Sequence, residues 1–149
     1  MSSPYSEPAP ASGAPGGKTS FMGLDSNVGA MLCYIANFLC CLGLVLAIVF
    51  LFTEKENRFV KFHAVQSLYL AALQIVAGIV IEILGLIVGM VLGMIKLGFL
   101  AGLLSWGFSI LVFAVFLIFW IIGGIKAYGG QWYKLPIIGE FAWKSVNNN

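Results

Sequence analysis

The chain has 149 residues, of which 60% are hydrophobic and only 9% are charged, and its mean hydropathy is +0.99. A soluble domain carries about 25% charged residues, and a chain this apolar has too little polar surface to face water, so lipid must surround most of it. These values exclude a soluble enzyme, a nucleic-acid-binding domain and a disordered protein, and a net charge of +2 is too small to indicate a polyanion such as nucleic acid as a partner.

The first 22 residues predict a disordered tail. Fifteen of the first twenty are Pro, Gly, Ser or Ala, with few aromatic residues and no periodicity. The tail also lacks the basic start and the apolar core of a signal peptide. We therefore expect one ordered helical domain over residues 23–144 and a flexible end at residues 145–149.

Long apolar stretches follow the tail, and about twenty such residues cross a bilayer as a helix. They predict spans at about residues 29–52, 68–94 and 98–125, and hence an all-α membrane protein with about three transmembrane helices. Three crossings leave the basic loop at residues 53–63 and the basic C-terminal tail on one side. Basic loops favour the cytoplasm, which predicts a multi-pass protein of the cell membrane with its N-terminus outside and its C-terminus in the cytoplasm.

The first predicted span contains the cysteines, which are Cys33, Cys40 and Cys41. Their spacing fits neither a metal site nor a disulfide framework. We interpret them as small apolar side chains of a helix, and the sequence predicts no cofactor.

Glycines recur at four-residue intervals in the second predicted span, at Gly85, Gly89 and Gly93, and Gly98 and Gly102 follow at the start of the third. Glycines at this spacing flatten one side of a helix, so that another backbone can approach closely. The pattern indicates helix packing, either within one chain or between copies.

Glu82 lies near the middle of the second predicted span, where a charged residue costs about 2.5–3.5 kcal/mol on insertion scales. Gln74 shares its face of the helix. We expect the Glu82 carboxyl to hydrogen-bond to another helix, with Ser109 as the first candidate partner and Asn37 as the second. Two interpretations stay open here, a carboxyl that locks helix packing and an intramembrane functional site.

Two polar blocks flank the spans: EKENRFVKFHAVQS at residues 54–67 and YKLPIIG at residues 133–139. Both resemble the signature of a family of small prokaryotic membrane proteins of largely unassigned activity. That family is similar to the twenty-kilodalton subunit of the chloroplast Tic translocon and to the MamF-like magnetosome proteins. The resemblance implies a multi-pass helical protein of the cell membrane. Its motif residues here are Glu54, Lys55, Glu56, Asn57, Arg58, Phe59, Phe62, His63 and Gln66, followed by Tyr133, Lys134, Leu135, Pro136 and Gly139.

The residues after the third predicted span indicate a short amphipathic segment. Pro136 breaks any continuous helix, and residues 137–144 have the pattern of a helix lying on the membrane surface. Trp132, Tyr133 and Trp143 suit the aromatic belt at a membrane interface. With both polar blocks on one side, we expect His63 and Gln66 to face the turn at residues 135–139.

The sequence shows no nucleophile–base pair, phosphate-binding loop or carboxylate pair, so it does not predict an enzyme. The leading interpretation is a membrane scaffold or assembly component that acts through its glycine face and its cytoplasmic blocks. Its expected partners are the lipid bilayer and further copies of the chain or other membrane proteins, with no nucleic acid. The alternative is a small oligomeric channel or transporter, in which His63, Gln74 and Glu82 line an aqueous path.

Overall fold

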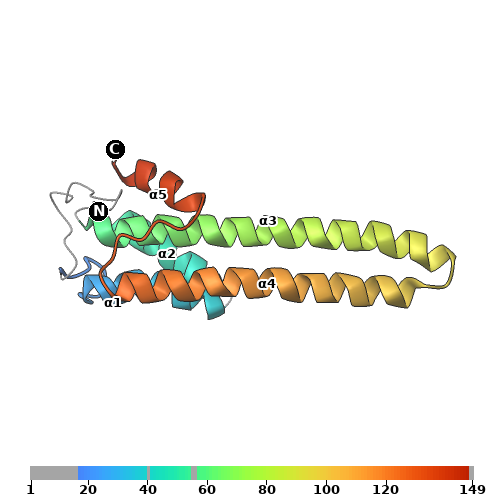
Figure 1. Cartoon of the computed structure of the whole chain (residues 1–149). Helices are drawn as coiled ribbons and strands as arrows, with labels where there is room; N and C mark the ends of the chain where they lie inside the picture. The colour runs from blue at the N-terminus through green and yellow to red at the C-terminus, as the bar shows by residue number, and fades with distance from the viewer. Residues whose placement is uncertain (1–16, 40, 55–56, 148–149) are drawn as a thin grey trace, which may run out of the picture.

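The computed structural model describes residues 17–39, 41–54 and 57–147, and this part of the chain is an all-α protein. Figure 1 shows a long helical hairpin with the shorter helices gathered around one of its ends. In chain order the elements are α1 (Ser26–Ile35), the 3-10 helix η1 (Ala36–Leu39), α2 (Cys41–Thr53), α3 (Arg58–Met94), α4 (Gly98–Tyr128) and α5 (Ile138–Asn147).

The hairpin consists of α3 and α4, which lie antiparallel and include the predicted helices at 68–94 and 98–125. With 37 and 31 residues, they are about 55 and 46 Å long, against a hydrocarbon core of about 30 Å. Asn57 caps the start of α3, because its side chain accepts a hydrogen bond from the Val60 N–H at 3.2 Å. The reversal after α3 places Lys96 at the tip of the hairpin, with a positive φ of 60°.

The predicted single helix over residues 29–52 is wrong. The structure divides this stretch into α1, η1 and α2, and α2 turns back along α1 (Figure 1). At 10 and 13 residues, α1 and α2 are about 15 and 20 Å long, so neither reaches across a bilayer. The turn needs a glycine at position 43, because a Cβ there would lie 2.1 Å from the backbone nitrogen of Asn37.

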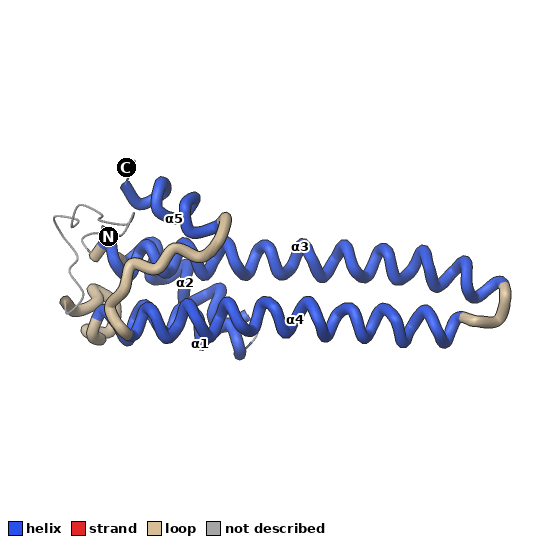
Figure 2. Tube along the Cα trace, in the orientation of Figure 1, coloured by secondary structure: helices blue, strands red, loops and turns tan. Residues whose placement is uncertain are grey.

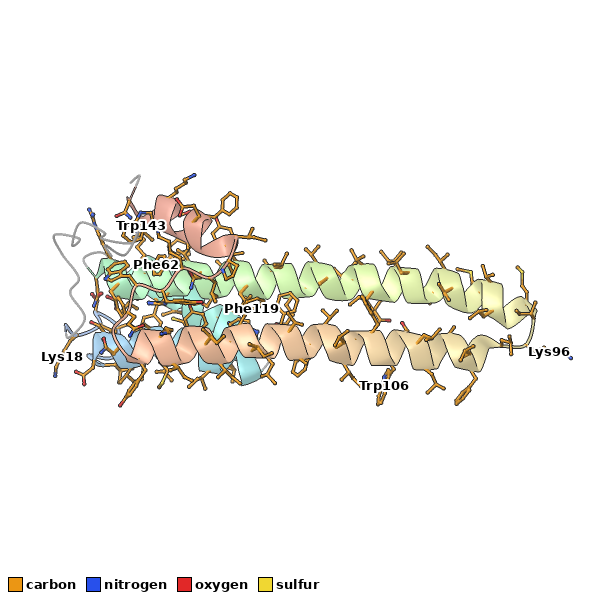
Figure 3. The ribbon with its side chains drawn as sticks, in the orientation of Figure 1. Lys18, Phe62, Lys96, Trp106, Phe119 and Trp143 are labelled. Atoms are coloured by element: carbon orange, nitrogen blue, oxygen red, sulfur yellow. The ribbon has the colours of Figure 1, made fainter. Side chains whose placement is uncertain are left out.

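The structure gathers the described parts of both chain ends at one end of the hairpin, whereas the sequence predicts them on opposite sides of the membrane. The Ser20 N–H donates to Oε1 of Glu54 at 2.6 Å, which holds the segment before α1 beside the loop between α2 and α3. Figure 3 places Lys18 at the opposite end of the molecule from Lys96. The loop after α4 starts at the Lys18 end, and α5 runs back toward that end (Figure 1). The reversal of the first apolar stretch explains the difference, since it removes one crossing.

The core lies at the Lys18 end of the hairpin, where α1, α2 and α5 all pack on α3 or α4. Beyond Ala71, by contrast, α3 is almost entirely exposed, and Ile81 is the one buried residue of its remaining length. Apolar side chains of α4 are exposed in the same half, from Phe99 to Ile121. A two-helix hairpin with this surface requires lipid around it, so the fold is that of a membrane protein.

The C-terminal segment crosses from the end of α4 over α3 and then forms α5, as the tan loop in Figure 2 shows. The buried residues of α5 follow a four-residue spacing at Ile138, Ala142 and Val146, so the predicted amphipathic segment forms. Its apolar face packs against Phe62 and Val65 of α3. The segment therefore covers the protein core. An amphipathic pattern is the same for a helix on a protein core and for a helix on a membrane surface, so the sequence did not distinguish the two.

Candidate functional site

A buried polar network joins α1, α3 and the loop after α4. Its side chains are those of Tyr34, His63 and Gln66, and each has no exposed surface. The Tyr34 hydroxyl lies 3.1 Å from Nδ1 of His63, and Nε2 of His63 lies 3.1 Å from the Gln131 carbonyl oxygen. Nε2 of Gln66 donates to the Tyr34 hydroxyl at 2.8 Å and to the Tyr133 carbonyl at 3.1 Å.

The directions of these hydrogen bonds follow from the chemistry of each group. A carbonyl oxygen only accepts, so Nε2 of His63 carries the proton that faces Gln131. In a neutral imidazole Nδ1 then accepts from the Tyr34 hydroxyl, whose oxygen accepts from Gln66. Oε1 of Gln66 accepts from the Leu135 N–H at 3.2 Å. The buried groups therefore satisfy one another without any charge, which makes the network a rigid support.

Aromatic rings enclose the imidazole of His63. The ring centroids of Phe59 and Phe62 lie 4.7 and 5.0 Å from it, and both phenylalanines also contact Trp132, at 5.3 and 5.4 Å. Trp132 in turn packs edge-to-face on Trp143 at 5.5 Å. Figure 3 shows Phe62 and Trp143 where α3 meets α5. These contacts fix the loop after α4 on α3.

The structure thus places the two predicted polar blocks against each other. Gln66 meets the expected turn through Leu135, whereas His63 binds Gln131, which precedes that turn. Sequence reasoning missed Tyr34. The available signal was its hydroxyl, because a tyrosine hydroxyl within an apolar helix needs a hydrogen-bond partner.

The start of the first block holds the segment before α1. Oε1 of Glu54, which is 1% exposed, accepts from the N–H groups of Ser20 and Phe21 at 2.6 and 3.3 Å. Asn57 donates to the Ser26 hydroxyl in addition to capping α3. Arg58 is half-buried at the start of α3. The motif residues Lys55 and Glu56 lie outside the described residues.

The rest of the second block shapes the turn into α5. Lys134 pairs with Glu140 at 3.4 Å, and its Nζ lies 4.5 Å from the ring centroid of Trp143. Pro136 accepts from the Ile138 N–H at 2.8 Å. Gly139 lies so close to Lys134 that a Cβ would come within 2.6 Å of the Lys134 Cα. The block is therefore a compact turn that leads into a helix.

A groove of about 500 Å³ runs between α3 and α4 in the exposed half of the hairpin. Glu82 lines it together with Ser109, the first predicted partner, and with Ser105. The structure records no hydrogen bond between Glu82 and Ser109 within the described residues. Asn37 of η1 donates instead to the Cys33 carbonyl of α1 at 3.1 Å, and it does not line the groove.

The three side chains of the predicted polar face of the second helix lie in three different environments. Oε1 of Gln74 accepts from Nε1 of Trp120 on α4 at 3.0 Å, His63 belongs to the buried network, and Glu82 is exposed in the groove. A continuous aqueous path through one chain would need these three side chains on one open surface. The structure does not bring them together.

Four of the predicted glycines, Gly85, Gly89, Gly98 and Gly102, line the groove, and they differ in what an added Cβ would meet. A Cβ at Gly85 would lie 2.3 Å from Oγ of Ser105, so this position serves the packing of α3 on α4. Gly98 contacts Gly93 at the hairpin tip, where a Cβ at Gly98 would lie 3.6 Å from the Gly93 Cα. Gly89 and Gly102 line the groove, and a Cβ at either would have no atom within 4 Å.

Comparisons with known proteins match the chain to one family model and to relatives that are named as membrane proteins. The model of a magnetosome magnetite crystal formation protein family matches residues 25–142. A UPF0132 membrane protein of Methanocaldococcus jannaschii is 39% identical over 85% of this chain and 92% of its own. A second one from that organism is 32% identical over 81% and 70%, and one from Archaeoglobus fulgidus is 30% identical over 83% and 97%. No solved structure matches the chain. The similarity to the Tic translocon subunit rests on the sequence motifs alone.

Proposed function

Because the chain belongs to the magnetosome magnetite crystal formation protein family, whose relatives here are named membrane proteins, we propose that it acts as a scaffold or assembly component of the cell membrane. Crystal formation is named for the family and not for these three relatives, so it is not part of the proposal. The partner is a transmembrane helix, from a further copy or from another membrane protein.

The observation that carries this proposal is the exposed groove between α3 and α4. It combines glycines that leave room for a close helix, Gly89 and Gly102, with the polar side chains of Glu82 and Ser109. Helices associate in lipid through close backbone packing and hydrogen bonds, since the surrounding lipid is as apolar as leucine. A partner helix in the groove would supply both, and it would give the Glu82 carboxyl a hydrogen-bond partner.

The distribution of basic residues supports cytoplasmic placement of both chain ends. The described parts of both chain ends lie at the Lys18 end of the hairpin. The described basic residues at this end are Lys18, Arg58, Lys61, Lys126, Lys134 and Lys144. Lys96 alone among the described basic residues lies at the opposite tip. Basic residues close to the ends of transmembrane helices favour the cytoplasmic side. The buried network at that end then serves as a rigid platform on the cytoplasmic face.

A matched pair of glycine variants tests the assembly role. Gly89→Leu fills the groove, whereas Gly78→Leu adds the same side chain to an exposed position of α3 that does not line it. A Cβ at either position meets no atom within 4 Å, so both variants should fold. We expect Gly89→Leu to lose the complexes that wild type retains in affinity purification and cross-linking from native membranes, and Gly78→Leu to keep them.

Two outcomes would count against assembly through the groove. One is that Gly89→Leu retains every complex of the wild type. The other is that Glu82→Gln keeps all complexes but abolishes an ion flux measured in liposomes, which would favour the channel interpretation.

A further inference from the structure

A second groove, of about 620 Å³, lies on the side of α3 that faces away from the buried polar network. Five residues of α3 line it: Lys61, Val65, Leu68, Tyr69 and Ala72. At about 100° per residue these positions fall on one face of the helix, whereas His63 and Gln66 point away from it. α3 thus separates the polar network from this groove.

The walls of the groove come from two further helices. Leu51 and Phe52 at the end of α2 form one side, and Ser145 of α5 contributes to the other. Leu51 and Val65 also pack on the cluster that joins α3 to α5, so the walls are held by the core. The groove is therefore built by three packed helices.

The lining changes from charged to apolar along α3. Lys61 is half-buried, and it forms no ion pair within the described residues. Arg58 precedes it by one turn and Lys144 adjoins Ser145. The nearby carboxylate of Glu54 is buried and accepts from the Ser20 and Phe21 N–H groups, and the lining residues of the groove include no carboxylate. Ala72 lies eleven positions after Lys61, which corresponds to about 16 Å of helix. Beyond Ala72 begins the exposed apolar half of the hairpin, at Leu73.

We propose that this groove binds an anionic phospholipid, with its phosphate at Lys61 and an acyl chain along Val65, Leu68 and Ala72. A phospholipid matches the groove along its length. Its negatively charged headgroup would lie at the cationic end, and its hydrocarbon chain would lie along the apolar residues. Each basic residue near an anionic membrane surface contributes about 1 kcal/mol of attraction, and the apolar walls bury the chain. Charge complementarity favours this occupant, since the charged side chain that lines the groove is the Lys61 ammonium and the remaining lining is mostly apolar.

Native mass spectrometry of the full-length protein in detergent tests the assignment, with titrations of phosphatidylglycerol and of phosphatidylcholine. We expect wild type to retain phosphatidylglycerol more tightly. Lys61→Gln should weaken that binding about fivefold and remove the preference, whereas Lys61→Arg should keep it. The control Lys96→Gln changes a lysine at the other end of the hairpin and should bind as wild type does.

A second variant tests the apolar part of the groove. Leu68→Trp narrows it without changing the charge, so it should weaken binding of both lipids, provided that thermal unfolding shows an intact fold. The proposal is overturned if Lys61→Gln and Lys96→Gln bind phosphatidylglycerol equally. It is also overturned if inorganic phosphate displaces the lipid, which would indicate a free anion site, or if Lys61→Gln changes the oligomeric state, which would indicate a second copy in the groove.

Discussion

The ring of Tyr34 on α1 occupies the space that a side chain at position 123 of α4 would need. A Cβ at Gly123 would lie 2.5 Å from Cε1 of Tyr34, closer than carbon atoms approach in folded proteins. The contact brings α1 against α4 and sets the position of the Tyr34 hydroxyl in the polar network. Close approach of two helices and satisfaction of buried polar groups therefore depend on each other at this point.

This relationship predicts opposite effects of one substitution at two glycines. Gly123→Ala forces the Tyr34 ring or the α1 backbone to shift, which should lower the free energy of unfolding by about 1–3 kcal/mol. Gly107→Ala, where a Cβ meets no atom within 4 Å, should leave stability unchanged or raise it by up to about 1 kcal/mol, because alanine is the better helix former. Thermal unfolding in detergent micelles measures both, and equal stability of the two variants would refute the tight contact.

The polar network predicts a large cost for removing Gln66. In Gln66→Leu the Leu135 N–H and the Tyr133 carbonyl lose their buried partner, which should reduce stability by about 3 kcal/mol. The control Gln74→Leu removes one hydrogen bond, to Trp120, and should cost about 1 kcal/mol. Denaturation in mixed micelles distinguishes these values. If Gln66→Leu were as stable as Gln74→Leu, the network would not support the fold as described.

Glu54 predicts a local effect on the segment before α1. Glu54→Ala removes the acceptor of the Ser20 and Phe21 N–H groups, so hydrogen exchange should become faster at residues 17–26. Glu140→Ala, which removes the carboxylate of the exposed ion pair with Lys134, serves as the control and should leave those amides as slow as in wild type. Unchanged exchange in Glu54→Ala would show that other contacts hold the segment.

The long helices could be predicted from the sequence because each apolar stretch exceeds the length of a bilayer crossing on its own. The same criterion failed for residues 29–52. The chain reverses within these residues because Gly43 lets the α2 backbone approach Asn37. A hydropathy pattern does not reveal such a turn. The predicted sidedness followed from a count of three crossings, so this one turn also removes the reason for placing the N-terminus opposite the C-terminus.

The candidate site could be predicted from the sequence only in part. The two polar blocks were recognisable as blocks, and Gln66 was expected near the turn that contains Leu135. The individual partners were not predictable, since Gln131 lies 68 positions after His63 and offers only its backbone carbonyl. Any residue supplies such a carbonyl, so no pattern of residue types identifies it.

If α3 and α4 make the two crossings, both chain ends lie on one side of the membrane. Single cysteines at positions 18, 96 and 144, in a chain with Cys33, Cys40 and Cys41 replaced by alanine, can be labelled in intact cells and in inverted vesicles with a membrane-impermeant maleimide. We predict that Lys18→Cys and Lys144→Cys react together in inverted vesicles, and that Lys96→Cys reacts in intact cells. Labelling of Lys18→Cys together with Lys96→Cys, and apart from Lys144→Cys, would contradict the account.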